Sequence, residues 1–125
     1  MYSDIAKDHF THPRNAGVMP DAEGEGSQEN PACGDLLKVF IKVDGGRIAD
    51  IRFQAFGCSS TIAAGSMVTE MVKGKTLSEA LAVTDRTISD ALGGLPPNKK
   101  HCSTLAAETL HQAVEDYRKR QGKRG

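Results

Sequence analysis

Two apolar segments separated by a short turn constrain the fold of this chain more than any other feature. Residues 36–43 (LLKVFIKV) and 47–56 (RIADIRFQAF) place apolar side chains at alternate positions, the pattern of a β-strand with one buried face. The DGG sequence between them is typical of a tight turn. We therefore predict a β-hairpin, and matching its two apolar faces pairs Val39 with Phe53.

The same register, extended to the open end of the hairpin, brings polar residues together. It sets Asp35 opposite Gly57 and places Cys33 within a residue of Cys58, because directly paired Cα atoms lie about 4.5–5.5 Å apart. Cys33 and Cys58 do not share a face in this register. We expect a bend or bulge at Gly57 to turn Cys58 around.

Helical patterns account for most of the remaining chain. We expect a short helix over residues 4–10, then a Gly- and acid-rich segment that forms a loop or an irregular sheet edge. Further helices are predicted over 61–73 (capped by Ser59 or Ser60), over 76–81, after a cap at Asp85 and ending at Gly93-Gly94, and over 103–120. Because helices follow the hairpin rather than alternate with strands, the predicted class is α+β: a small antiparallel sheet, hairpin plus edge strand, packed against several helices.

Length and charge exclude several classes of protein. The 125 residues fit one domain, and we expect 1–125 to form it, with a mobile N-terminal segment over about 1–30. Equal numbers of basic and acidic residues, 16 of each, argue against binding to nucleic acid or membranes. The apolar runs are shorter than the roughly 20 residues of a membrane span, and the first twelve residues lack a signal-peptide core. A cytoplasmic protein is expected.

The chain contains three cysteines, Cys33, Cys58 and Cys102. An odd number does not suit a closed disulfide framework, and one interpretation is three unrelated buried thiols. Cys58 and Cys102 each precede a predicted helix, whose N-terminus favours thiolate. If the last helix begins near the open end of the hairpin, the cysteines converge with Asp35 or His101. Three soft thiolates and one oxygen or nitrogen donor suit zinc or an iron–sulfur cluster.

A thiol enzyme is a competing interpretation, since His101 directly precedes Cys102. Adjacent residues at a helix start are expected to point in different directions, and catalytic cysteines and histidines are typically distant in sequence. We therefore favour a metal or cluster site over a catalytic cysteine–histidine pair.

Four motifs occur in order along nearly the whole chain: HFTHPRNAG, NPACGD, FGCSSTIAAGSMVTEMVKGKTLSEA and LPPNKKHCSTLA. They resemble the iron–sulfur scaffold family formed by the IscU proteins and the N-terminal domain of NifU. The resemblance implies a scaffold for de novo cluster assembly. Such a scaffold takes sulfur from a cysteine desulfurase and iron, builds a labile 2Fe-2S cluster, and transfers it to apo-proteins. The resemblance further implies that reductive coupling of two such clusters, usually in a homodimer, can give 4Fe-4S.

The resemblance also implies roles for individual residues. Cys33, Cys58 and Cys102 match the three cluster cysteines, and Cys102 matches the usual acceptor of persulfide sulfur. Asp35 matches the aspartate of the CGD motif, and His101 the histidine before the last cysteine. We favour Asp35 as the fourth ligand, because a carboxylate is a harder and weaker ligand for cluster iron than a thiolate and should keep the cluster labile. His101 is the alternative, with a role in binding zinc or iron in the apo form.

Two features qualify the resemblance. The motif LPPNK carries Asn98 where many IscU proteins have valine, which argues against the Hsp70-type chaperone that binds this segment. The chain keeps His101 and lacks an obvious long insertion before the last cysteine, so it looks less like SufU, the zinc-binding relative. A zinc-dependent sulfur relay for a desulfurase, and a structural zinc domain acting through protein contacts, remain as alternatives.

Overall fold

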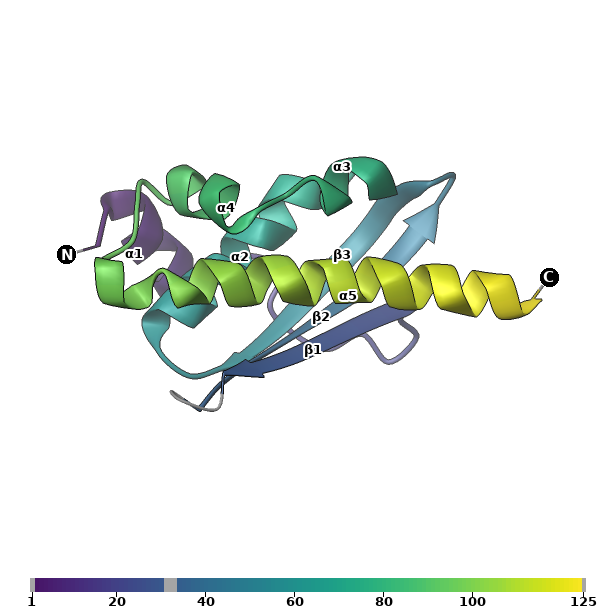
Figure 1. Cartoon of the computed structure of the whole chain (residues 1–125), viewed down its shortest axis with the longest axis horizontal. Coiled ribbons are helices and arrows are strands. Elements are labelled where there is room, and N and C mark those ends of the chain that lie inside the picture. Colours follow the sequence, from purple (N-terminus) through teal and green to yellow (C-terminus); the bar gives the residue numbers. More distant parts are fainter. Residues whose placement is uncertain (1, 31–33, 125) are drawn as a thin grey trace.

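The computed structural model describes residues 2–30 and 34–124, in which helices pack on one three-stranded sheet (Figure 1). The elements are α1 (Asp4–Thr11), β1 (Gly24–Asn30), β2 (Asp35–Asp44), β3 (Arg47–Phe56), α2 (Ser59–Val72), α3 (Leu77–Leu81), α4 (Asp85–Ala91), the 3-10 turn η1 (Pro97–Lys99) and α5 (His101–Arg124). The predicted α+β class is confirmed. None of the described helices is long and apolar enough to span a membrane.

The hairpin forms with the predicted register. β2 and β3 are antiparallel, and Val39 lies opposite Phe53. A register shift between Lys42 and Val43 displaces the pairing by one residue near the turn. β1 pairs antiparallel with the other side of β2, which gives the strand order β1-β2-β3 and confirms the predicted edge strand.

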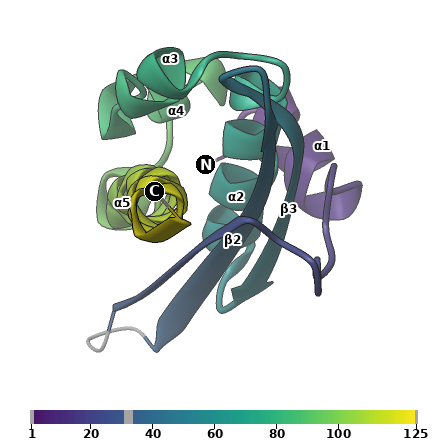
Figure 2. The same cartoon turned by 90° about the vertical axis from the view of Figure 1, so that its right-hand side faces the viewer.

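The core lies between one face of the sheet and the helices α2 and α5 (Figure 2). α2 packs over β3, α5 packs over β1, and α1 packs on α2. Alternate residues of β2 and β3 are fully buried against these helices: Leu37, Val39, Ile41, Ile51 and Phe53. This alternation is the reason why the apolar pattern of the sequence predicted the hairpin.

Glycines allow the helices to lie directly on the sheet. A β-carbon on Gly26 of β1 would stand 2.2 Å from the carbonyl oxygen of Thr109 in α5. A β-carbon on Gly65 of α2 would likewise stand 2.6 Å from a ring carbon of Phe53 in β3. Since real β-carbons do not approach other atoms so closely, both contacts require glycine.

The outer side of β3 is covered by the segment that follows α1. The N–H of Gly17 donates to the carbonyl of Phe53 at 2.8 Å, and the N–H of Phe53 donates to the carbonyl of Asn15 at 3.0 Å. The chain thereby satisfies backbone groups that an edge strand would otherwise expose.

On the free side of β1, side chains of α5 accept hydrogen bonds from backbone N–H groups of the strand. The N–H of Glu25 donates to Asp116 at 2.9 Å, and the N–H of Ser27 donates to Gln112. These amides therefore bond to a helix rather than to a neighbouring strand.

Three helix starts differ from the predictions. α4 begins at Asp85, and Thr84 caps it in place of Asp85. α2 begins at Ser59, with Cys58 in the capping position in place of Ser59 or Ser60, although its side chain makes no capping hydrogen bond. α5 begins at His101 instead of residue 103, because the turn η1 leads directly into it. Cys102 therefore lies inside the first turn of α5. Within residues 2–30, α1 and β1 are regular elements, and the mobility expected for this segment stays a prediction.

Candidate metal centre

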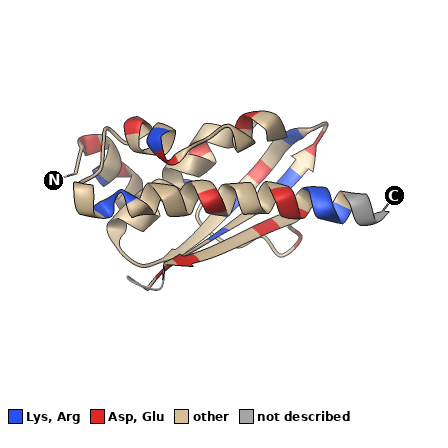
Figure 3. Ribbon diagram, in the orientation of Figure 1, with Lys and Arg blue, Asp and Glu red and all other residues tan. Residues whose placement is uncertain are grey.

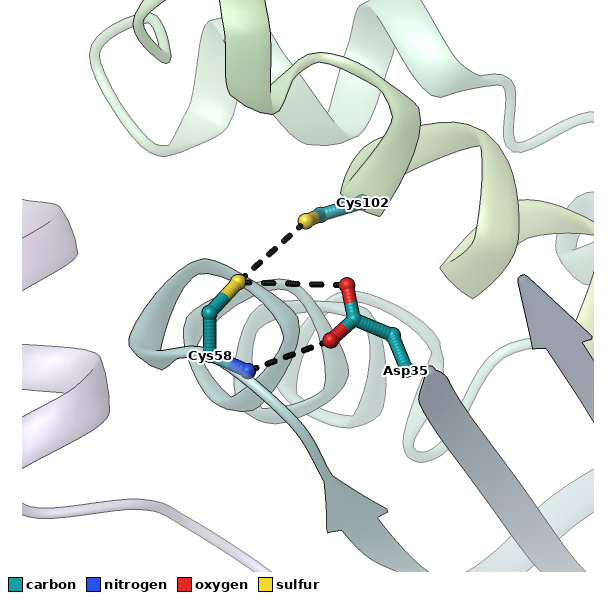
Figure 4. Close-up of side chains that lie close together, drawn as sticks. All are labelled: Asp35, Cys58 and Cys102. Carbon is teal, nitrogen blue, oxygen red and sulfur yellow. Dashed lines mark hydrogen bonds between the residues drawn. The ribbon is translucent and has the colours of Figure 1, made fainter. Parts of the chain in front are cut away.

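Three elements distant in sequence bring potential metal ligands together at one end of the sheet (Figure 4). Asp35 begins β2, Cys58 precedes α2, and Cys102 lies in the first turn of α5. The sulfur atoms of Cys58 and Cys102 are 3.9 Å apart, and Oδ2 of Asp35 is 3.9 Å from the Cys58 sulfur. One ligand atom from each residue lies within 4.8 Å of the others. The hairpin register thus delivers Asp35 to Cys58, as predicted.

The close approach of Asp35 depends on the residue before Cys58. Gly57 has a φ of 152°, and a β-carbon there would stand 2.1 Å from Oδ1 of Asp35. That oxygen accepts a hydrogen bond from the N–H of Cys58 at 3.2 Å. The bend predicted at Gly57 therefore makes room for the carboxylate beside the start of α2.

The two described thiols differ in exposure and in pKa. Cys58 is half-buried. Burial raises the pKa of its thiol, but the Thr61 hydroxyl and the N–H groups of Thr61 and Ser60 outweigh that effect and leave the pKa below its ordinary value. Cys102 has no exposed surface, and burial raises the pKa of its thiol to about 12, with the neighbouring Cys58 adding to the rise. The prediction that both helix starts favour thiolate was therefore wrong for Cys102, because desolvation outweighs the helix dipole.

His101 lies at the edge of this group and contacts two of its members. Its Nε2 is 3.4 Å from Oδ2 of Asp35 and 3.6 Å from the sulfur of Cys102. The expectation that His101 and Cys102 point in different directions was wrong, since the first turn of α5 lets both side chains face β2. His101 also lines an open cleft of about 260 Å³ with Leu105 and Glu108.

The third predicted ligand, Cys33, lies outside the described residues. On either side of it, Asn30 and Asp35 pair across β1 and β2, and the N–H of Gly34 donates to the carbonyl of Asn30 at 2.8 Å. The assignment of Cys33 as a ligand therefore stays a prediction.

Sequence reasoning missed two buried polar residues near these elements. Thr61 of α2 lies between the two described thiols, and its spacing of three residues after Cys58 was the only signal for it. His9 of α1 is buried and its Nδ1 lies 2.8 Å from the hydroxyl of Ser66 in α2. The motif HFTHPRNAG contains His9 and offered a signal, although no periodicity marked it.

Comparison with known proteins decides the family. The sequence matches the family described as the NifU-like N terminal domain over residues 1–124. The chain belongs to the IscU/NifU N-terminal domain family. Two relatives are iron–sulfur cluster assembly scaffold proteins: IscU 1 of Archaeoglobus fulgidus is 54% identical over 98% of this chain and 80% of that protein, and IscU of Aquifex aeolicus is 52% identical over 98% and 79%.

Solved structures of similar proteins share the fold. A putative iron–sulfur cluster assembly scaffold protein for the SUF system from Fervidobacterium islandicum superposes with a TM-score of 0.75 at 22% identity, covering 90% of this chain and 96% of that one. The N-terminal NifU-like protein of Brucella abortus gives 0.76 at 15% identity, covering 94% of both chains. At these identities the likeness extends to the fold of the IscU/NifU domain alone.

Charged residues are distributed along most of the described chain. Figure 3 shows acidic and basic residues interspersed over the described ribbon, with a basic group near the C-terminal end of α5. That end is separated by nearly the whole length of the helix from Cys102 (Figure 1). Among the described residues, the group that could hold a metal ion, Asp35, Cys58 and Cys102, lies at the opposite end, beside the start of α5.

Proposed function

We propose that the protein is a scaffold on which an iron–sulfur cluster is assembled and from which it is passed to other proteins. The observation that carries the proposal is the convergence of one carboxylate and two thiols from three separate elements. The names of the IscU relatives support the same conclusion.

The donor set suits a cluster that must leave again. Thiolates of Cys58, Cys102 and Cys33 are soft ligands that bind cluster iron strongly. The carboxylate of Asp35 is a harder ligand, and an iron atom bound to it is the natural point of attack for an acceptor's thiolate. Asp35 is our proposed fourth ligand, with a 2Fe-2S cluster as cargo.

In this proposal, one of the thiols, that of Cys102, accepts the sulfur from which the cluster is built. A cysteine desulfurase carries sulfur as a persulfide; the Cys102 thiolate attacks its outer sulfur, the new S–S bond forms on Cys102, and the donor thiolate leaves. Because Cys102 has no exposed surface and burial raises the pKa of its thiol to about 12, the first turn of α5 has to move, or His101 has to swing away, so that the thiol loses its proton to solvent before the attack. Half-buried Cys58 stands at the more accessible side of the site.

Further partners belong to the same proposal. Apo-proteins accept the cluster, and a homodimer brings together two 2Fe-2S clusters, which couple to 4Fe-4S when an external reductant supplies two electrons. Asn98 in the chaperone-binding motif disfavours an Hsp70-type partner. The expected setting is the cytoplasm, and the whole chain acts as a single domain.

A zinc-dependent sulfur relay is the second candidate. Nε2 of His101 lies near both Asp35 and Cys102, so a nitrogen donor is available to complete a zinc site with thiolates. In that case zinc in the apo form, rather than a cluster, would occupy the site while Cys102 accepts sulfur.

Anaerobic reconstitution with ferrous iron, cysteine, a desulfurase and a thiol reductant that converts persulfide sulfur to sulfide tests the proposal, followed by absorption and Mössbauer spectroscopy. We expect cluster bands that disappear as an apo-ferredoxin gains them. Cys58→Ser should abolish the signal, whereas Ser59→Ala, a neighbour on the same helical turn, should leave it unchanged. A colourless protein that holds one zinc ion and still accepts sulfur on Cys102 would establish the relay instead.

A further inference from the structure

Thr61 is a buried polar residue to which the proposed roles assign nothing. It is the third residue of α2 and has no exposed surface. Its Oγ1 lies 3.4 Å from the sulfur of Cys102 and 3.6 Å from the sulfur of Cys58. Across residues 2–30 and 34–124, these two sulfur atoms are the only hydrogen-bond partners of that hydroxyl.

Other buried threonines in the helices behave differently. The hydroxyl of Thr69 donates to the carbonyl of Ser66 at 2.7 Å, and that of Thr109 donates to the carbonyl of Leu105 at 2.6 Å. Such bonds to the preceding turn are the usual way for a helical threonine to satisfy its hydroxyl. Thr61 instead directs its hydroxyl at two thiols.

The two thiols are weak partners while they are protonated. A hydroxyl has one proton, and a thiol sulfur is a weak acceptor, so neutral thiols compensate little of the cost of burying Oγ1. A thiolate sulfur, free or bound to metal, carries charge and accepts a much stronger hydrogen bond. The position of Thr61 therefore suits the charged, metal-bound state of the cysteines better than the neutral one.

We propose that Thr61 is a positioning residue of the metal centre: its hydroxyl orients the sulfur atoms of Cys58 and Cys102 toward each other and hydrogen-bonds to a thiolate sulfur when these cysteines bind metal. The inference rests on the proposed function, since it requires the cysteines to bind metal. Thr61 itself is no ligand. Partners that hydrogen-bond to metal ligands typically contribute about 10–100-fold to metal affinity.

Anaerobic titration of the metal-free protein with Co²⁺ tests this role, because cobalt–thiolate bonds give a charge-transfer band in the near ultraviolet. Thr61→Val keeps the shape of the side chain and removes the hydroxyl. We expect it to weaken Co²⁺ binding by about tenfold or more and to move the band to lower energy, since a thiolate without its hydrogen bond is a stronger electron donor. Thr61→Ser, which keeps the hydroxyl, should restore both the affinity and the band position.

Thr109→Val is the matched control, because it removes an equally buried hydroxyl from the helix that carries Cys102. It should bind Co²⁺ as the wild type does. Wild-type affinity and an unshifted band in Thr61→Val would overturn the proposal, as would equal losses in Thr61→Ser or Thr109→Val, which would indicate packing. If Thr61→Val does not fold, Thr61→Ala provides the same comparison.

The outcomes also separate this inference from the proposed function. Co²⁺ binding that depends on the Thr61 hydroxyl, in a protein that assembles no cluster, would support the positioning role and contradict the scaffold. If the protein assembles a cluster and Thr61→Val changes neither the Co²⁺ affinity nor the band, the scaffold is supported and the positioning role is contradicted. A wild-type protein without a cobalt–thiolate band would contradict both.

Discussion

Gly57 and Asp35 approach so closely that a β-carbon at position 57 would lie 2.1 Å from Oδ1 of the carboxylate. The φ of 152° at Gly57 then directs the next N–H, that of Cys58, toward the same oxygen. The orientation of the carboxylate toward the Cys58 sulfur therefore depends on the absence of a side chain one residue earlier.

Gly57→Ala should displace Asp35 and destabilise the protein by about 1–3 kcal/mol, because the new methyl group clashes and the backbone angle is unfavourable for alanine. Urea unfolding and the cluster yield after reconstitution measure the two effects. Gly74→Ala is the control: φ there is also positive, at 83°, but a β-carbon would meet nothing within 4 Å. It should lose stability with an unchanged cluster yield. An unchanged yield in Gly57→Ala would contradict the prediction.

Asp35→Ala should retain an assembled cluster longer and transfer it more slowly, because it removes the hard ligand at which an acceptor attacks. The rate at which cluster absorption moves to an apo-ferredoxin measures the effect. Asp44→Ala changes an exposed aspartate at the other end of β2 and should transfer at the wild-type rate. Unchanged retention and transfer in Asp35→Ala would exclude this role for the carboxylate.

Iodoacetamide should modify Cys58 well before Cys102 in the metal-free protein at about pH 8, because the thiolate is the reactive form. Cys58 is half-buried with a lowered pKa, whereas Cys102 is buried with a pKa of about 12. Below that pKa, the rate of modification at Cys102 should rise about tenfold for each unit by which the pH is increased. Peptide mass spectrometry assigns each modification, with the urea-unfolded protein as the control in which the thiols react alike. Faster modification of Cys102 in the folded protein would refute the assignment.

Gly26→Ala should destabilise the protein by about 1–3 kcal/mol, because the added methyl group forces α5 away from β1. The β-carbon would stand 2.2 Å from the Thr109 carbonyl oxygen and 2.8 Å from the Ala113 nitrogen. Ser27→Ala, at the next and exposed position, should change the free energy of unfolding little. Equal stabilities of these two variants in urea would show that the contact between helix and strand relaxes easily.

Stability should fall as the pH drops below about 6.5, because the fold holds the pKa of His9 below its ordinary value. Burial lowers the pKa of His9, and the nearby Arg14 lowers it further. The unfolded chain, in which histidine titrates near 6.5, therefore binds a proton that the folded state does not. His9→Asn should reduce the slope of stability against pH between about 5 and 7, while His12→Asn, at an exposed site, should keep it. An unchanged slope in His9→Asn would show that a group other than His9 causes the pH dependence of stability.

The hairpin could be predicted in detail because its alternating pattern reports directly on one buried face. Val39 and Phe53 pair as the two apolar stripes require, and the same register leads to Asp35 beside Gly57. The convergence of Cys58 with Asp35 was accessible for this reason. The contribution of α5 to the site could not be predicted, because no local sequence pattern indicates where the start of a distant helix packs.

β1 was harder to predict, because its sequence, GEGSQEN, has few residues that favour strands. It forms a regular strand since its glycines let the backbone of α5 pack directly on it, which is a tertiary effect. The burial of Cys102 has a similar origin: the sequence places it near a helix start, but α2 and β2 exclude water from it. The opposite pKa shifts of the two thiols follow from that packing and could not be read from their positions.

The covered sides of β1 and β3 limit how two copies of this chain can associate. Asn15 and Gly17 bond to β3, and α5 side chains bond to Glu25 and Ser27 of β1. A second copy cannot add its own strand at these residues without first displacing them. Two loaded copies that exchange electrons or clusters would have to meet through side-chain surfaces. An encounter of this type leaves each sheet intact for the next round.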